Sequence, residues 1–143
     1  MRAARVSKVP MIAIVDDDEA MRDALSDLLQ VMGFDSRSFD CAAAFLADFV
    51  PGRFDCLITD VRMPGIDGIE LQRRLRARGS TLPVLMITSA PDPAVQLRAL
   101  GGGACAYLAK PVDDGVLFDH LRAALGQDGG PDEPASGTSS QGG

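Results

Sequence analysis

Three aspartates are the residues of this sequence best suited to chemistry. Asp16 and Asp17 directly follow the apolar segment Met11–Val15, and Asp60 ends a second segment that begins at Asp55. If the two segments are parallel strands of one sheet, the three carboxylates converge, and like charges raise one another's pKa. A bound cation offsets this repulsion, and a few oxygen ligands that leave room for water suit Mg²⁺ better than zinc or calcium. The acids therefore predict a magnesium site.

A simpler role for these acids is helix capping. Acidic side chains at the N-terminus of a helix accept hydrogen bonds from free backbone N–H groups, and Asp16, Asp17 and Asp18 all precede a helix-like segment. Asp18 fits this role. We favour metal binding for Asp16 and Asp17 because the matching Asp60 ends a different strand.

A hydroxyl and an ammonium group follow two further apolar segments. Thr88 ends the segment Pro83–Thr88, and Lys110 with Pro111 follows the segment Cys105–Leu108. Phosphoryl transfer requires charge neutralisation and hydrogen-bond donors around the equatorial phosphate oxygens. Each residue is a weak signal alone, because a strand-terminal threonine is usually structural and Lys–Pro is usually a surface turn. Together with the three acids they predict a site for phosphoryl transfer.

Five short strand-like segments alternate with five helix-like segments. The strands are predicted at Met11–Val15, Asp35–Phe39, Asp55–Asp60, Pro83–Thr88 and Cys105–Leu108. The helices are predicted from about Glu19 to Met32, over Cys41–Val50, after Pro64–Gly65, from near Asp92 to an end in Gly101–Gly103, and around Leu117–Leu125. Apolar strands separated by helical crossovers are typical of an α/β fold with a doubly wound, five-stranded parallel sheet. In such a sheet, ligands bind at the carboxyl ends of the strands.

Length, composition and net charge limit the number of domains and the kinds of partner that are expected. The length of 143 residues suits one domain, and the composition changes abruptly after Gly126. We predict an N-terminal extension at 1–10, a domain at 11–126, and a disordered tail or truncated linker at 127–143, where no large apolar residue offsets the entropy of ordering. The net charge of −6 argues against direct binding to nucleic acid or to an anionic membrane. Four arginines of the third helix are interpreted as a solvated face; they are Arg73, Arg74, Arg76 and Arg78.

The three cysteines, Cys41, Cys56 and Cys105, are widely spaced among apolar neighbours. An odd number of cysteines, in a chain without a histidine cluster, argues against structural zinc and against a disulfide framework. We interpret them as small buried hydrophobes in a reducing compartment. The basic start of the chain lacks the features of a signal peptide, and no apolar run reaches bilayer-spanning length. We therefore expect a cytoplasmic protein without a membrane contact.

Four motifs stand in the order and spacing of a known family; they are Ile14–Asp18, Thr59–Gly68, Thr88–Ser89 and Tyr107–Pro111. Over about Met11 to Leu125, the sequence resembles the receiver domain of bacterial two-component response regulators. The stretch that begins at Asp60 is most similar to receivers that usually precede a helix-turn-helix output domain. The resemblance implies a flavodoxin- or CheY-like (βα)5 fold with the strand order 2-1-3-4-5.

The resemblance also implies a role for each site residue. Asp60 accepts a phosphoryl group from a sensor histidine kinase or a phosphotransfer protein. Asp17, Asp60 and the backbone carbonyl of Arg62 hold Mg²⁺ directly. Asp16 helps through water, and Lys110 pairs with the acyl phosphate. Beyond this self-phosphorylation and autodephosphorylation, the chain is not expected to be an enzyme.

A switch is a further implication of the resemblance. Thr88 moves to hydrogen-bond an oxygen of the acyl phosphate, and Tyr107 then turns inward. This movement alters the surface formed by the fourth helix, the fifth strand and the fifth helix. The partner that contacts this surface would be a downstream protein effector, a missing output domain, or a second copy in a phosphorylation-dependent homodimer. Tyr107 could instead be an ordinary strand aromatic with a surface hydroxyl. The Lys110–Pro111 bond is expected to be cis.

Two features depart from the family pattern. The sequence carries no output domain, which leaves a stand-alone receiver or a receiver cut within a linker. Ala90 stands two residues beyond Thr88, where many fast-hydrolysing receivers have a polar side chain that positions the attacking water, and Arg62 stands two residues beyond Asp60. We hypothesise that the aspartyl phosphate is comparatively long-lived.

Three other interpretations remain open. A haloacid-dehalogenase-type phosphatase also uses an acid at a strand end, but Glu19–Ala20 departs from its motif and its late paired acids are absent. A flavodoxin-like module needs backbone donors from a Gly/Ser/Thr loop for its phosphate, whereas aspartates follow the first strand. A pseudo-receiver keeps the fold without phosphorylation; the intact acids, Thr88 and Lys110 argue against it.

Overall fold

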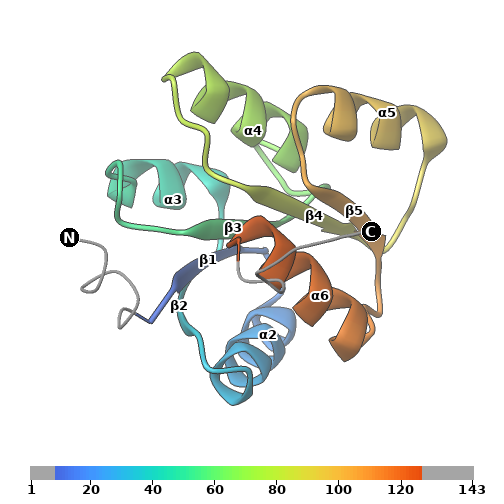
Figure 1. The fold of residues 1–143 in the computed structure, drawn as a ribbon. Coiled ribbons are helices and arrows are strands. Elements are labelled where there is room, and N and C mark those ends of the chain that lie inside the picture. The colour runs from blue at the N-terminus through green and yellow to red at the C-terminus, as the bar shows by residue number, and fades with distance from the viewer. Residues whose placement is uncertain (1–8, 127–143) are drawn as a thin grey trace, which may run out of the picture.

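A computed structural model describes residues 9–126, and its five strands form one parallel sheet. The strands are β1 (Met11–Val15), β2 (Asp35–Phe39), β3 (Cys56–Asp60), β4 (Val84–Thr88) and β5 (Ala106–Ala109). They stand in the order β2-β1-β3-β4-β5 (Figure 1), and every neighbouring pair runs parallel. The predicted α/β fold and strand order are confirmed. Because the strand order reverses between β1 and β3, a ligand site is expected at the carboxyl ends of these two strands.

Five helices within residues 9–126 cover the two faces of the sheet. They are α2 (Glu19–Val31), α3 (Ala42–Asp48), α4 (Gly68–Ala77), α5 (Pro93–Gly101) and α6 (Asp114–Ala124). One face carries α2 and α6, which bury Leu25 and Leu117, and the other carries α3, α4 and α5, which bury Phe45, Leu71 and Ala99 (Figure 1). Since both faces are covered, the central strands are largely apolar, with polar residues only toward the carboxyl ends of β3 and β4.

The edge strand β2 differs from the central strands. β1, β3 and β4 are buried along almost their whole length, whereas β2, with the sequence Asp-Ser-Arg-Ser-Phe, is mostly exposed. It pairs with β1 alone. An edge strand tolerates polar residues because one of its sides meets water. The position of β2 in the sequence therefore followed from the alternation of strands and helices, not from apolarity.

Most predicted element boundaries agree closely with the structure, and the second helix is the exception. It was predicted to reach Val50, but α3 ends at Asp48, and Phe49 already has extended backbone angles (φ −71°, ψ 128°). Val50 precedes Pro51, whose ring disfavours helical conformation in the residue before it. The first helix ends as predicted, with Gly33 at φ 93°, a left-handed conformation that glycine adopts readily.

The cysteines are not all buried, so that prediction was only partly right. Cys56 is buried in β3, Cys41 is half-buried, and Cys105 is exposed. The Sγ atom of Cys41 accepts a hydrogen bond from the backbone N–H of Ala44 at 3.4 Å and so caps α3. Cys105 lies just before β5, where the chain has not yet entered the covered part of the sheet. An apolar sequence context alone does not distinguish these positions.

Two predicted segments fall outside the described residues. These are most of the N-terminal extension at 1–10 and the tail or linker at 127–143. Among residues 9–126, no helix has the length and apolarity needed to cross a bilayer.

Candidate functional site

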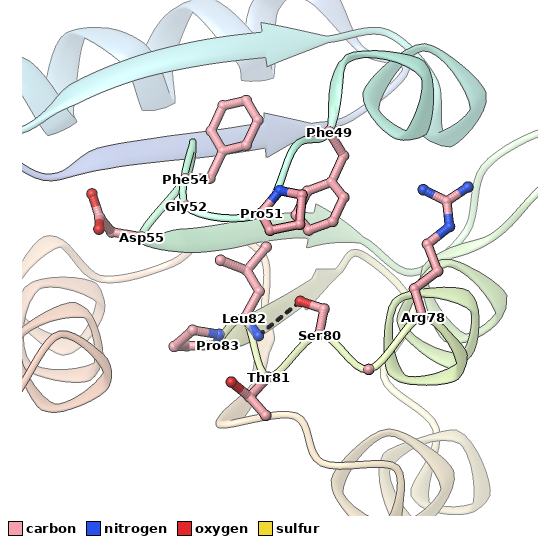
Figure 2. Close-up of a pocket in the computed structure, with 11 residues that line it drawn as sticks. Phe49, Pro51, Gly52, Phe54, Asp55, Arg78, Ser80, Thr81, Leu82 and Pro83 are labelled. Carbon is pink, nitrogen blue, oxygen red and sulfur yellow. Dashed lines mark hydrogen bonds between the residues drawn. The ribbon is translucent and has the colours of Figure 1, made fainter.

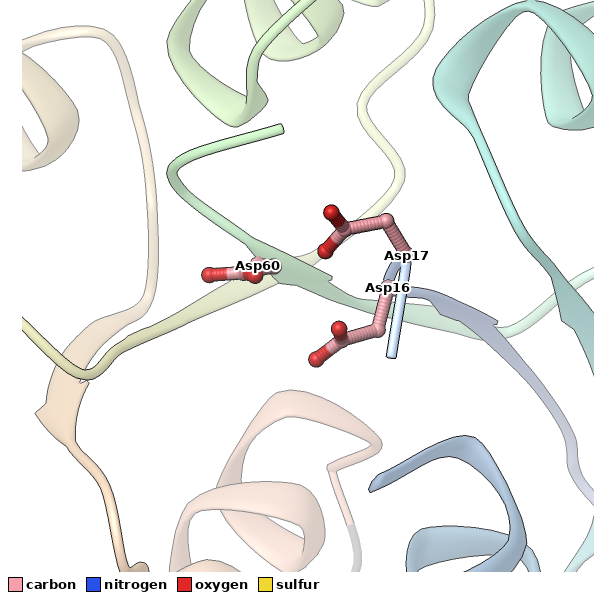
Figure 3. A group of neighbouring side chains, drawn as sticks. All are labelled: Asp16, Asp17 and Asp60. Carbon is pink, nitrogen blue, oxygen red and sulfur yellow. The ribbon is translucent and has the colours of Figure 1, made fainter. Parts of the chain in front are cut away.

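The three predicted acids converge at the carboxyl edge of the sheet. Asp16 follows β1 and Asp60 ends β3, and these strands are direct neighbours through the pair Val15 and Thr59. Oxygen atoms of Asp16, Asp17 and Asp60 lie within 4.8 Å of one another (Figure 3). Asp16 is fully buried and Asp60 is 7% exposed, whereas Asp17 faces solvent. The geometry is that of a small acidic pocket open on one side.

Asp16 is held at several points. Its Oδ1 accepts from the backbone N–H of Asp18 at 2.9 Å, and its Oδ2 accepts from Lys110 Nζ at 3.0 Å. Its backbone oxygen accepts from Nη1 of Arg22 at 2.8 Å. Sequence reasoning missed Arg22, because a half-buried arginine in the first turns of a helix has no distinctive local signal. Asp18 itself caps α2, as expected, by accepting from the N–H of Ala20 at 3.0 Å.

The charges around Asp60 are only partly balanced. Burial raises the pKa of Asp60, and the negative charge of Asp16 raises it further, while Lys110 and the backbone N–H of Arg62 oppose this. Lys110 Nζ lies 3.5 Å from Asp60 Oδ2. Burial by itself lowers the pKa of Lys110, but the hydrogen bond and charge of Asp16, together with Asp60, raise it overall. One ammonium group thus pairs with two of the three carboxylates, those of Asp16 and Asp60.

The donor set fits a hard divalent cation. All three side chains offer oxygen, and the pKa of Asp60 is raised mainly by burial and further by the negative charge of Asp16. A cation such as Mg²⁺, which retains several water ligands, suits a partly open pocket of this kind. The exposed Asp17 is the acid most accessible to a hydrated ion. The chemistry of the pocket therefore supports the magnesium prediction.

Thr88 and Lys110 lie at the same edge as the acids. Thr88 ends β4 and is fully buried, and its Oγ1 accepts from the N–H of Ala90 at 3.1 Å. The backbone N–H of Lys110 donates to the backbone oxygen of Thr88 at 2.8 Å, which fixes the two residues side by side. The Lys110–Pro111 bond is cis, as predicted. The structure thus brings together the residues that the sequence placed at strand ends.

Tyr107 connects β5 to the start of α5. Its side chain is half-buried, and its hydroxyl oxygen accepts from the backbone N–H of Asp92 at 3.1 Å. Asp92 is the N-cap of α5, where its Oδ1 accepts from the N–H of Ala94 at 2.8 Å. The Tyr107 hydroxyl is therefore not a free surface group but part of the contact that positions α5.

A glycine allows the chain to return close to Asp60. Gly68, the first residue of α4, donates its N–H to the oxygen of Val61 at 2.9 Å. A Cβ atom at this position would lie 2.5 Å from the backbone oxygen of Asp60. Asp67 caps the helix by accepting from the N–H of Glu70 at 2.8 Å. The Asp-Gly pair in the sequence motif is thus required by local packing beside the acid.

A pocket of about 510 Å³ lies at the opposite end of the sheet (Figure 2). Asp55 and Pro83, which line it, directly precede β3 and β4. Phe49 and Phe54 form part of its apolar wall. None of the predicted site residues lines this pocket, so it is separate from the acidic cluster.

Comparison with known proteins decides the family. The model of the response regulator receiver domain matches residues 12–122. The chain is similar to the transcriptional regulatory protein FixJ of Bradyrhizobium diazoefficiens, with 44% identity over 117 residues, which cover 81% of this chain and 57% of FixJ. It is also similar to the response regulator protein TodT of Pseudomonas putida, with 36% identity over 82% of this chain and 52% of TodT.

The chain belongs to the response regulator receiver domain family.

A solved receiver structure shares the arrangement of the whole domain. The chemotaxis protein CheY4 of Vibrio cholerae superposes with a TM-score of 0.76 and 28% identity, covering 82% of this chain and 100% of CheY4. The chain spans about half the length of the curated relatives it matches. It is thus a receiver domain of two-component response regulators with a CheY-like fold, and its acidic pocket lies at the carboxyl edge of the sheet.

Proposed function

We propose that Asp60 of this receiver domain accepts a phosphoryl group from a sensor histidine kinase or a phosphotransfer protein, in a Mg²⁺-dependent reaction. The observation that supports this proposal most strongly is the grouping of the acids. Carboxylate oxygens of Asp16, Asp17 and Asp60 lie within 4.8 Å of one another, and Lys110 Nζ lies 3.5 Å from Asp60 Oδ2. Asp60 ends a buried strand and offers a carboxylate oxygen as nucleophile. Phosphoryl transfer needs little more than positioning and charge neutralisation, which these residues supply.

The metal ligands follow the pattern that the resemblance to receiver domains implies, and the grouping of the three acids is compatible with it. Asp17, Asp60 and the backbone carbonyl of Arg62 would hold Mg²⁺ directly. Asp16 would act through water, because both of its carboxylate oxygens already accept hydrogen bonds from Asp18 and Lys110. When bound, the ion neutralises negative charge on the carboxylates and on the incoming phosphate.

The transfer step requires an ionised Asp60. One carboxylate oxygen of Asp60 forms a bond to phosphorus while the bond from phosphorus to the donor imidazole nitrogen breaks and leaves its electron pair on the imidazole. Lys110, which already lies beside Asp60, pairs with the resulting acyl phosphate. The Thr88 hydroxyl, which here accepts from Ala90, would rotate to donate to a phosphate oxygen. Self-phosphorylation and autodephosphorylation would be the only catalysis.

The contact between Tyr107 and Asp92 supports a switch. If Thr88 moves toward the phosphate, Tyr107 can turn inward only by giving up its hydrogen bond to Asp92 N–H at the start of α5. The surface of α5, β5 and α6 would change as a result. This surface exposes Leu97 on α5, at 74%, and Val116 on α6. Such apolar side chains suit a protein effector, an output domain or a second copy in a phosphorylation-dependent homodimer.

We place this receiver in the cytoplasm, where a kinase phosphohistidine would meet it. Its net charge of −6 favours protein partners over direct contact with nucleic acid or a membrane. Any effect on DNA would pass through another domain or another protein.

The test is phosphorylation by a small donor. The protein is incubated with Mg²⁺ and acetyl phosphate, and the intact mass is measured beside an Asp60→Asn control. One phosphoryl group should be added to the wild type, and none without Mg²⁺ or in the control. A phosphoryl group that persists in Asp60→Asn would refute the acceptor assignment, and an unmodified wild type would favour a pseudo-receiver. Multiple turnover of a phosphate ester would instead support a phosphatase.

A further inference from the structure

Helices α4 and α5 carry an excess of positive charge on an acidic protein. They lie side by side on one face of the sheet (Figure 1), and Nε2 of Gln72 on α4 donates to the oxygen of Ala99 on α5 at 3.0 Å. The two helices contain four arginines against one glutamate, whereas the chain as a whole has a net charge of −6. A local positive electrostatic potential on an otherwise anionic protein attracts an anionic partner.

A pocket of about 480 Å³ lies between these helices. Its lining includes Gln72, Arg73 and Arg76 of α4, and Arg98, Gly101 and Gly102 at the end of α5. At Gly101 an added Cβ would meet no atom within 4 Å, so this part of the lining is open to an approaching chain. Two of the four arginines that the sequence indicated as a solvated face, Arg73 and Arg76, therefore border this pocket, whose exposed lining is otherwise mostly apolar.

The guanidinium groups are available for an anion to different degrees. Arg76 is held by backbone oxygens, with Nη1 donating to Leu82 at 2.8 Å, so it is fixed in place without a carboxylate that offsets its charge. Arg73 and Arg74 both form ion pairs with the same carboxylate, that of Glu70. Arg98 is exposed, and no carboxylate within residues 9–126 lies at ion-pair distance from it. Within residues 9–126, Arg76 and Arg98 thus offer positive charge that has no carboxylate at ion-pair distance.

Gln72 is a buried polar side chain that lines the pocket and has one unpaired atom. It is only 2% exposed, and although its Nε2 donates to Ala99, its Oε1 has no hydrogen-bond partner. A buried carbonyl oxygen without a donor is uncommon and unfavourable. Since Gln72 lines the pocket, an N–H group of a bound molecule that displaces the side chain slightly would satisfy it.

We propose that the pocket between α4 and α5 binds an acidic segment of a protein partner. Carboxylates of the segment pair with Arg76 and Arg98, and a backbone N–H supplies the donor that Gln72 Oε1 lacks. A nucleic acid brings many phosphates but meets repulsion from the rest of this acidic surface. The other pocket (Figure 2) is a poorer candidate, because its Ser80 Oγ already accepts from Leu82 N–H at 3.1 Å. No residue of the phosphoryl site is involved.

The test is direct binding of an acidic peptide to the unphosphorylated protein at low ionic strength. The probe is a fluorescein-labelled octapeptide of alternating Glu and Ser, with a Gln/Ser octapeptide as the control ligand. Anisotropy should show saturable binding of the Glu peptide with a Kd below about 1 mM. In ¹H–¹⁵N spectra, the side-chain amide of Gln72 and the backbone amides of Gly101 and Gly102 should shift on titration.

Matched arginine variants locate the site. Arg98→Ala should weaken the Glu peptide about tenfold, because it removes one charge-assisted pair. Arg37→Ala removes the same charge from β2, at the opposite edge of the sheet, and should leave Kd unchanged. Equal weakening by both variants, equal binding of the Gln peptide, or no saturation would overturn the proposal. Tighter binding of a single-stranded oligonucleotide at the same residues would also overturn it. Phosphorylation of Asp60 should be unaffected in Arg98→Ala, so the two proposals fail separately.

Discussion

Arg22 holds the loop that carries two of the three acids. Its guanidinium donates to the backbone oxygen of Asp16 at 2.8 Å, and Asp16 in turn accepts from Lys110. The contact fixes the chain direction at the point from which Asp17 projects. Groups that orient metal ligands affect metal affinity nearly as strongly as the ligands themselves.

Arg22→Ala should therefore weaken Mg²⁺ binding by roughly tenfold. The effect arises because Asp16 and Asp17 lose a fixed position. This loss of positioning should outweigh the removal of a nearby positive charge, which by itself favours a cation. Mg²⁺ titration followed by amide chemical shifts gives the affinity, and Arg22→Lys should recover part of it. Arg37→Ala, which removes an equal charge from the distant strand β2, serves as the control. Equal affinities in Arg22→Ala and Arg37→Ala would show that Arg22 does not position the site.

Ala90 bears on the lifetime of the acyl phosphate. It has no polar side chain to orient water, and only its backbone N–H reaches the site, by donating to Thr88 Oγ1 at 3.1 Å. We expect a long-lived aspartyl phosphate in the wild type, and a shorter lifetime in Ala90→Asn because an amide can position the attacking water. Dephosphorylation after removal of acetyl phosphate provides the measurement. An aspartyl phosphate lifetime of seconds in the wild type would contradict this hypothesis.

The start of α4 is set by packing against the end of β3, the strand that ends at Asp60. Gly68 opens the helix where a Cβ atom would lie 2.5 Å from the backbone oxygen of Asp60 and 3.1 Å from the Cα atom of Val61. Both of these are backbone atoms, which cannot rotate away. The start of α4 and the end of β3 are therefore in close backbone contact.

Gly68→Ala should lower the free energy of unfolding by roughly 1–3 kcal/mol, since the backbone must shift to admit the methyl group. Gly101→Ala is the matched control, because it lies in α5 with no atom within 4 Å of the added Cβ. Alanine should be neutral or stabilising there, by up to about 1 kcal/mol. Urea denaturation measures both variants. A Gly68→Ala protein as stable as the wild type would mean that the approach of α4 to β3 is looser than described.

The three thiols report on the integrity of the whole fold. Cys105 is exposed, Cys41 is half-buried at the cap of α3, and Cys56 is buried inside the central sheet. Burial, with a smaller contribution from Cys105, raises the pKa of Cys56 to about 12. Because the thiolate is the reactive form, Cys56 should be inert in the native protein.

Ellman's reagent should consequently label Cys105 quickly and Cys56 only as fast as the protein unfolds. Cys105→Ser should remove the fast phase and leave the slow phase unchanged. Labelling in increasing urea should accelerate the slow phase until it merges with global unfolding. Rapid labelling of Cys56 in native buffer would contradict the buried position of β3.

Much of the fold could be predicted because its signals are local. The alternation of strands and helices indicated a parallel sheet, and even the polar strand β2 was located by its place between two helices. The end of α3 was missed because the conformation of Phe49 depends on the Pro51 turn as well as on helix propensity. The exposure of Cys105 was missed because burial depends on how far the covering helices extend.

The sequence by itself determined which residues can meet at the proposed phosphoryl site. Asp16, Asp60, Thr88 and Lys110 each stand at the end of a strand, and parallel strands bring their carboxyl ends to one edge whatever the details of packing. Only the tertiary structure decided the contacts of Arg22 with Asp16, of Tyr107 with Asp92, and of Gln72 with Ala99. These contacts join separate elements through particular side-chain rotamers and helix positions, which leave no periodic signal in the chain.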